Sequence, residues 1–177
     1  MVIIRPTGRI AKRKKVKLSS NEQLSSTTLG DWYALDLVIE RRQYILCTNE
    51  KGRLSVILHA APYAEFHRRI SKAVADVLRE IGVSDEKTAA DISKMTDLVL
   101  AKTTNRSVLG SMNEFRFMLQ AHSQRGRFRH EKLFKMSLCL ADTISLILPE
   151  ATPAEEVLKL FSEPPKAPSL RFRWSMI

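Results

Sequence analysis

The sequence predicts an α+β fold, and two features of the chain carry this prediction. Three apolar or alternating runs follow one another closely between residues 31 and 60, which is the pattern of an antiparallel β-meander. Most of the chain after Pro62 instead shows apolar residues at helical spacing. No internal repeat is visible. We therefore expect one α+β domain over residues 1–163, with a sheet packed by three to five helices, and a Pro-rich, basic and aromatic tail over residues 164–177.

The expected strands follow from local patterns. The segment VIIRP near the N-terminus holds three apolar β-formers and stops at Pro6. The meander runs are WYALDLVIE, QYILCTNE and RLSVILHA, and the connections between them are short enough to force antiparallel pairing. The central run, Tyr44 to Cys47, is apolar throughout, so we expect it to be covered on both faces. The segment DLVLAKT predicts one further strand near residues 98–103.

The expected helices show apolar stripes. The clearest runs from Pro62 to Ile81 and ends at Gly82, and its buried stripe is predicted to be Phe66, Ile70, Val74, Val77 and Ile81. Other helices are predicted over residues 84–95, from about residue 108 onward, over residues 131–148, and from Thr152 to Phe161. Near the N-terminus, Thr7 suits the cap of a short basic helix that turns Ile10 and Ala11 inward.

Positive charge is concentrated in two stretches of a chain whose formal net charge is +10. Residues 1–17 contain no acid, and residues 125–135 contain Glu131 alone. Such clustering is typical of proteins that bind a polyanion, usually nucleic acid, although a solubilising surface has the same composition. The residues that we expect to contact phosphate are Arg9, Lys12, Arg13, Lys14, Lys15, Arg125, Arg127 and Arg129.

The segment TTNRSVLGSMNEF, residues 103–115, links the last expected strand to a helix. Asn105 or Ser107 is a suitable N-cap, and Ser111 with Glu114 has the spacing of a capping box. Gly110 would let the helix pack closely against another backbone. The free N–H groups of the same junction attract phosphate or carboxylate, and Arg106 would reinforce that attraction. We therefore expect a helix cap first and an anion site second.

Metal, cofactor and membrane sites have little support. Cys47 and Cys139 lie in apolar stretches and are expected to be buried free thiols. There is no CxxC, no zinc-type histidine spacing, no Walker pattern and no GxGxxG, so we assign no metal, cofactor or catalytic residue. No apolar run reaches the length of a membrane span, and no apolar signal core follows the basic N-terminus, so we expect a cytoplasmic protein without a membrane partner.

Short blocks in the sequence point to a family. They are RPT (residues 5–7), LGDWYA (29–34), RR (41–42), TNE (48–50) and NRSVLGSMN (105–113). In this order they resemble an uncharacterised family of small bacterial proteins, a domain of unknown function, over about residues 1–120. The segment ATPAEEVLKLF is similar to the way such proteins end. The resemblance implies a shared fold.

These blocks fall at expected strand ends and helix starts, where polar side chains can converge at one rim of a sheet. The residues of this candidate rim are Arg5, Asp31, Arg41, Thr48, Asn49, Asn105, Arg106, Ser107 and Asn113. A buried hydrogen-bond network that only fixes the fold would show the same sequence pattern.

Together these observations favour a binding protein. We expect a small basic bacterial, plasmid or phage protein that binds DNA or RNA, or a nucleic-acid-associated partner, in a setting such as defence, counter-defence or a toxin–antitoxin pair. One alternative is a metal-independent ribonuclease that uses Asn105, Arg106, Ser107 and a histidine. The other is an inhibitor or adaptor whose basic face meets an acidic protein.

Overall fold

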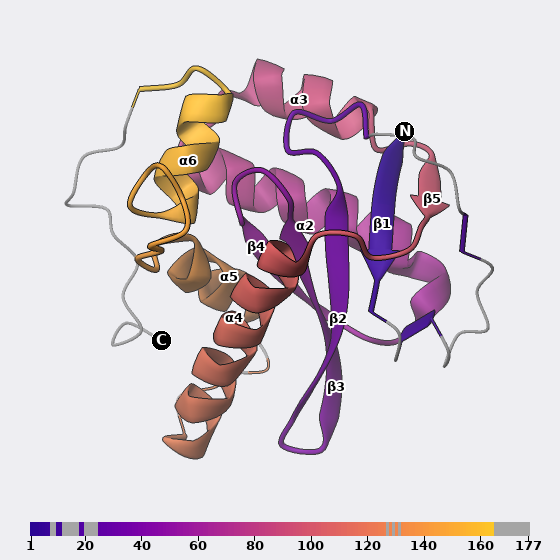
Figure 1. Ribbon diagram of the computed structural model, residues 1–177, viewed down its shortest axis with the longest axis vertical. Coiled ribbons are helices and arrows are strands. Elements are labelled where there is room, and N and C mark those ends of the chain that lie inside the picture. Colours follow the sequence, from indigo (N-terminus) through magenta and orange to yellow (C-terminus); the bar gives the residue numbers. More distant parts are fainter. Residues whose placement is uncertain are drawn as a thin grey trace.

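The computed structural model describes residues 1–7, 10–11, 18–19, 25–126, 128, 130 and 132–164. These residues form the predicted α+β fold, a five-stranded sheet with helices around it (Figure 1). The strands are β1 (Val2–Pro6), β2 (Trp32–Ile39), β3 (Arg42–Asn49), β4 (Ser55–His59) and β5 (Leu98–Leu100). The helices are α2 (Phe66–Ile81), α3 (Asp85–Ser93), α4 (Arg106–Gln124), α5 (Leu133–Ala141) and α6 (Pro153–Leu160), and a 3-10 turn, Tyr63–Glu65, precedes α2.

The sheet has the order β4-β3-β2-β1-β5 and is mixed. β2, β3 and β4 form the predicted antiparallel meander. The turn between β2 and β3 has only two residues, Glu40 and Arg41, which both adopt positive φ angles of 49° and 64°. This is the backbone twist that two-residue hairpins require. β1 instead pairs in parallel with both β2 and β5.

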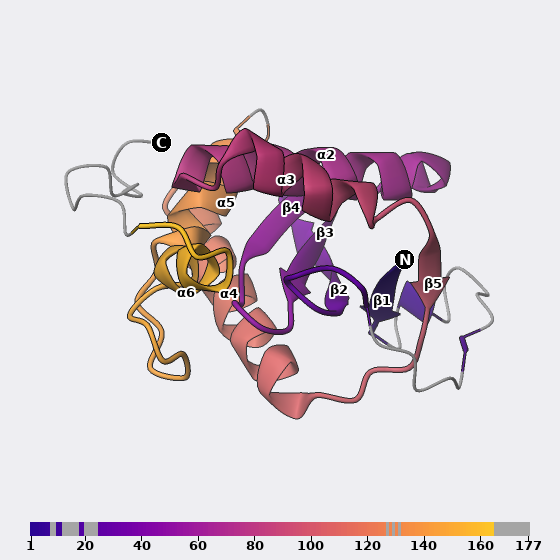
Figure 2. The ribbon, with the colours of Figure 1, turned by 90° about the horizontal axis from the view of Figure 1, so that it is seen from above.

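Helices cover both faces of the sheet. Figure 2 shows α2 and α3 on one side and α4 on the other. Successive side chains of a strand point to opposite faces, and the central strand β3 shows the consequence. Ile45 and Cys47 pack toward α2, whereas Tyr44 and Leu46 pack toward α4. The expectation that this strand is covered on both faces is confirmed.

The helix α2 has the predicted buried stripe, Phe66, Ile70, Val74, Val77 and Ile81. It ends at Gly82, which adopts a left-handed conformation with φ 111° and whose N–H donates to carbonyls of the last turn. At the edge of the sheet, α5 packs on β4, and the Ser137 hydroxyl accepts a hydrogen bond of 3.0 Å from the Ile57 N–H. This contact satisfies one N–H of the edge strand.

Several predicted boundaries were wrong. The helix predicted over 131–148 ends at Ala141, because the Thr143 hydroxyl bonds back to the Cys139 carbonyl and the Ser145 N–H turns to the Ala151 carbonyl. The last strand is three residues long. Ser111 and Glu114 form no capping box, because α4 begins at Arg106 and the Ser111 hydroxyl donates to the Ser107 carbonyl inside the helix.

Several other predictions are confirmed. The last helix starts after Thr152, as predicted, and Thr152 and Glu155 form a capping box in which each accepts a hydrogen bond from the other's backbone N–H. Cys47 and Cys139 are buried and free, as predicted. Ile10 is buried and lies in a helical conformation with Ala11. The rest of the expected basic helix, and the tail beyond residue 164, lie outside the described residues.

Candidate functional site

The start of α4 is capped by Asn105, as the sequence predicted. The Asn105 side-chain oxygen accepts hydrogen bonds from the backbone N–H groups of Ser107, at 3.0 Å, and Val108, at 3.4 Å. The Asn105 amide nitrogen donates to a carboxylate oxygen of Glu50 at 3.0 Å. Its own backbone N–H donates to the Tyr33 hydroxyl at 3.1 Å. One residue thus ties the helix start to β2 and to the end of β3.

A polar row of the sheet lies under this helix start. Arg5, Tyr33, Thr48 and Ser55 are direct cross-strand partners on β1, β2, β3 and β4. Because direct partners point to the same face, all four side chains lie on the α4 side. The Thr48 and Ser55 hydroxyls are 2.7 Å apart, and the Tyr33 hydroxyl is 3.1 Å from that of Thr104.

A buried ion pair extends the row at the β1 end. Arg5 Nε donates to Asp31 Oδ2 at 2.6 Å, and the two residues are 7% and 2% exposed. Arg5 also donates to the Lys102 carbonyl, at 2.5 Å, and the other Asp31 oxygen accepts from the Ser25 N–H at 3.1 Å. The pair therefore joins β1, the start of β2 and the segment after β5.

A second arginine, Arg53, lies at the β4 end of this polar row. It is 7% exposed, and its guanidinium donates to the Glu50 carbonyl and, at 3.1 Å, to the Ser107 hydroxyl. Burial lowers its pKa, and the nearby Glu50 and Tyr33 act in the opposite direction. The Glu50 carboxylate thus lies beside both Arg53 and the α4 start. Its contact at the helix start is the Asn105 side-chain amide, and a negative charge is favourable near a helix N-terminus.

We call this set the junction network: Arg5, Asp31, Tyr33, Thr48, Glu50, Arg53, Ser55, Thr104, Asn105 and Ser107. It brings together five residues of the expected rim, namely Arg5, Asp31, Thr48, Asn105 and Ser107. Its sheet members are buried, namely Arg5, Asp31, Tyr33, Thr48, Arg53 and Ser55, whereas Glu50 and Asn105 are half-buried and Thr104 and Ser107 are exposed. Such a network can fix strand ends and a helix start, and its buried part offers no surface to a ligand.

The other expected rim residues lie elsewhere. Asn49 is buried on the opposite face of the sheet from its neighbour Thr48, and its amide donates to the Leu29 carbonyl at 2.8 Å. Arg41 lies in the β2–β3 turn, at the far end of those strands. Arg106 and Asn113 are exposed on α4.

Some members of the network were missed from sequence. Tyr33 and Glu50 could have been found, because they lie within the blocks LGDWYA and TNE. Arg53 and Ser55 could not have been found from sequence. They reach the network through the pairing of β4 with β3 and through the backbone conformation of Arg53, whose φ is 57°.

A different cluster lies at the opposite end of β3. The Tyr44 ring has its centroid 5.3 Å from the rings of His59 and Phe128, and 5.8 Å from that of His130. His130 bonds on one side to the Tyr44 hydroxyl and on the other to Glu40, at 2.8 Å. The bond from His130 lowers the Glu40 pKa. The Ser123 hydroxyl donates to the same carboxylate at 2.9 Å.

These contacts tie the end of α4 to the β2–β3 turn, and Figure 1 shows both at the same end of the molecule. We call this region the basic end, defined by Arg41, Arg42, His59, Arg69, Arg125 and His130. Arg41, Arg42, His59 and Arg125 are exposed. Arg69 donates to the carbonyls of His59, Ala61 and Pro62. Burial, followed by the charges of Arg69, His130 and Arg42, lowers the His59 pKa.

Of the residues expected to contact phosphate, Arg125 is the one that the described ranges include. It caps the C-terminal end of α4. Arg9, Lys12, Arg13, Lys14, Lys15, Arg127 and Arg129 lie outside the described residues.

The histidines do not join the junction network. His59 pairs with Tyr44, at the far end of β3 from Thr48. His122 lies in the last turn of α4, roughly 24 Å along the helix from Arg106 at 1.5 Å per residue. His67 bonds to the Met95 carbonyl. The expected ribonuclease arrangement of Asn105, Arg106 and Ser107 with a histidine is therefore not assembled by the described residues.

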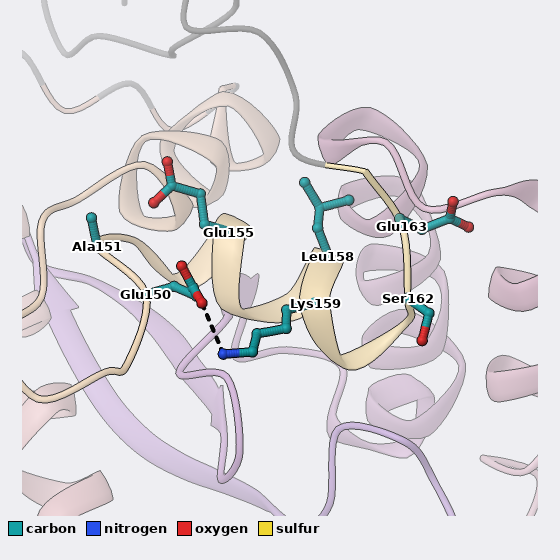
Figure 3. Close-up of a pocket in the computed structure, with 7 residues that line it drawn as sticks. All are labelled: Glu150, Ala151, Glu155, Leu158, Lys159, Ser162 and Glu163. Atoms are coloured by element: carbon teal, nitrogen blue, oxygen red, sulfur yellow. Dashed lines mark hydrogen bonds and ion pairs between the residues drawn. The ribbon is translucent and has the colours of Figure 1, made fainter.

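A groove of about 510 Å³ runs along α6 (Figure 3) and is lined by Glu150, Ala151, Glu155, Leu158, Lys159, Ser162 and Glu163. The acidic side chains that line this groove have partners within the chain. Glu150 pairs with Lys159 at 2.9 Å, Glu155 belongs to the capping box, and Glu163 accepts from the Ser84 N–H. Within the described ranges there is no group of three side chains that could hold a metal ion. None of the helices described is long and apolar enough to cross a membrane.

The fold and the junction define a class of protein, a small α+β domain whose mixed sheet carries helices on both faces and whose strand ends are tied to α4 by buried polar groups. The chain belongs to the family described as Domain of unknown function (DUF6933), whose model matches residues 3–156. This match reaches beyond the resemblance at residues 1–120 and takes in α5 and the start of α6. No curated protein and no solved structure matches the chain.

Proposed function

We propose that this protein binds nucleic acid through its basic end. The observation that carries the proposal is the Glu40 carboxylate, which accepts from both Ser123 and His130. Through these bonds the end of α4, with Arg125, lies against the turn that contains Arg41 and leads into Arg42, the first residue of β3. Two basic segments that are far apart in the sequence therefore meet on one surface.

The chemistry of this surface suits a phosphate backbone. The described ion pairs include none for Arg41, Arg42 or Arg125, so their guanidinium groups are available to an anion. Arginine donors match phosphate oxygens in a bidentate geometry. The exposed His59 ring packs against Tyr44 at an interplanar angle of 40° and offers a flat surface for a nucleotide base. The residues of the first basic stretch, Arg9 to Lys15, remain sequence-based predictions for the same partner.

The test is the salt dependence of binding to duplex DNA and to single-stranded RNA. Each phosphate contact contributes about 0.9 to the slope of log affinity against log salt on duplex DNA, and about 0.7 on single strands. We expect Arg41→Gln/Arg42→Gln and Arg125→Gln to flatten this slope. We expect Arg13→Ala/Lys14→Ala/Lys15→Ala to do so as well.

The matched control is Lys51→Gln/Lys102→Gln, which removes two exposed positive charges without a described ion pair at the opposite end of the sheet, since Lys51 follows the end of β3 and the Lys102 carbonyl accepts from Arg5. It should leave the slope nearly unchanged. An equal loss of affinity in the control and in Arg41→Gln/Arg42→Gln would show that net charge, rather than the basic end, causes binding. No retardation of DNA or RNA at low salt would refute the proposal.

A further inference from the structure

The outward face of α4 is exposed and combines a glycine, a phenylalanine and two opposite charges. The inward face of this helix is buried through Val108, Met112, Phe115 and Leu119. The outward face carries Arg106, Gly110, Asn113, Glu114 and Phe117, all of them exposed, and the Phe117 side chain is 74% exposed. We call this surface the α4 outer face. Figure 2 shows α4 as the outermost element on its side of the sheet.

Gly110 has no role in the packing of the described chain. A Cβ atom placed at Gly110 would meet no atom within 4 Å. Glycine in the interior of a helix is unfavourable relative to alanine. What glycine does offer at an exposed helix position is close approach by another backbone. The described part of the chain supplies no such backbone, which points to a partner.

The charges of this face are symmetric about Gly110. Arg106 lies four residues before Gly110 and Glu114 four residues after it, and at 3.6 residues per turn all three lie on the same side of the helix. Neither charged side chain has a hydrogen bond or ion pair within the described residues. The face is therefore complementary to itself when two copies meet in opposite directions.

We propose that α4 pairs with α4 of a second copy of this chain, antiparallel and with a two-fold axis at Gly110. In this arrangement Arg106 of each copy faces Glu114 of the other, which gives two identical ion pairs. The two Gly110 positions face each other and allow the helices to approach closely. Phe117 of each copy covers the segment just before α4 of the other. Such an interface uses the same patch twice, as a two-fold dimer must.

The size of the contact sets the expected strength. One helix crossing covers less than the roughly 800 Å² per partner that stable interfaces bury. The dimer is therefore weak and depends on concentration, with a dissociation constant in the micromolar range or above. Antiparallel α4 helices also place their dipoles in opposite directions, which is electrostatically favourable.

Sedimentation velocity over a range of protein concentrations, without nucleic acid, tests the proposal by charge exchange. The chain should pass from monomer to dimer as concentration rises. Arg106→Glu or Glu114→Arg alone places like charges opposite each other, and each should weaken association about tenfold. The double variant Arg106→Glu/Glu114→Arg restores opposite charges and should recover the dimer. A chain that stays monomeric throughout, or a double variant as weak as the single ones, would overturn the proposal.

A cross-linking experiment locates the axis. A residue on a two-fold axis faces its own copy, so Gly110→Cys should form a disulfide-linked dimer under mild oxidation. Asn113 is expected to face Ser107 of the second copy, so Asn113→Cys should cross-link roughly tenfold more slowly, because disulfides require Cα atoms within about 7 Å. The buried Cys47 and Cys139 allow the unsubstituted chain to serve as a blank. Faster cross-linking at position 113 than at position 110 would contradict this axis.

Discussion

At the scale of single residues, the clearest feature is the pair Arg5–Asp31. Both side chains are almost fully removed from water, and each has further hydrogen bonds to the backbone. Desolvation of two charges is expensive, so such a pair adds little net stability over two apolar residues. Removal of one partner is different, because it leaves the other charge buried without compensation.

We therefore predict that Asp31→Ala lowers the free energy of unfolding by about 3–5 kcal/mol. Asp76→Ala is the matched control, since Asp76 pairs with Lys72 on the surface of α2. Its loss should amount to about 1 kcal/mol or less. Urea denaturation of the three proteins measures both values. Similar losses for the two variants would mean that the buried ion pair contributes no more to stability than the surface pair.

The helix cap permits a second comparison within one helix. Asn105→Ala removes the acceptor for two N–H groups and the donor to Glu50, and should lower the free energy of unfolding by about 1–2 kcal/mol. Asn113→Ala removes the same amide from the exposed surface of α4, and should change stability by less than about 0.5 kcal/mol. Thermal or urea unfolding distinguishes the two, and a larger effect at Asn113 would contradict the assigned cap.

At the scale of elements, apolar spacing was sufficient for most strands and helices. The α2 stripe and the doubly covered β3 follow directly from which residues are apolar. The parallel placement of β1 between β2 and β5 could not be predicted, because it depends on a long connection through residues 7–31 and on no local pattern. The end of α5 was missed for a related reason. Residues 142–148 are apolar enough for a helix, but Ile144 and Leu146 are exposed and hydrogen bonds to Cys139 and Ala151 turn the chain.

The candidate site is also only partly predictable from sequence. The sequence blocks placed several polar residues at strand ends, and the junction network contains them. The blocks alone do not show that Arg41 and Thr48 lie at opposite ends of the β2–β3 hairpin, but the predicted meander does, since residue 41 falls in the connection and Thr48 near the end of the second run. Sequence spacing also could not show that Glu50, which follows β3, reaches the start of α4 and accepts a hydrogen bond from the Asn105 amide.

Two glycines give an element-scale prediction. Gly110→Ala should stabilise the monomer by about 0.5–1 kcal/mol, because the added methyl group meets no atom and alanine favours the helix. Gly82→Ala should destabilise the protein, because alanine disfavours the left-handed conformation at φ 111°. Unfolding measured at low protein concentration keeps association out of the comparison. Destabilisation by Gly110→Ala under those conditions would reveal a packing role within the chain.

At the scale of the whole molecule, the junction network and the basic end occupy opposite ends of β3. They are separated by about seven residues, or roughly 23 Å at 3.3 Å per residue. Substitutions at one end should therefore add to those at the other, as distant sites usually do. The junction network governs stability, and the proposed nucleic-acid surface is separate from it. The α4 helix connects the two, since it begins at the first and ends at the second.

The two cysteines offer a measure of whether the whole molecule opens as one unit. Cys47 lies in the centre of the sheet on β3, and Cys139 lies on α5. Burial raises the pKa of both thiols, to about 12 for Cys139. At pH 8 both are therefore protonated and shielded in the folded state, whereas an unfolded thiol with a pKa near 8.5 is partly ionised and reactive.

We expect neither thiol to react with an aromatic disulfide reagent at pH 8 until the protein unfolds, and both to react together once it does. Under conditions where reclosing is faster than labelling, both labelling rates then follow the global free energy of unfolding. Asp31→Ala should raise both rates by the same factor, since it destabilises the fold that covers both sites. Faster labelling of Cys139 alone would show instead that α5 detaches from β4 without the sheet coming apart, and that the molecule has two cooperative units.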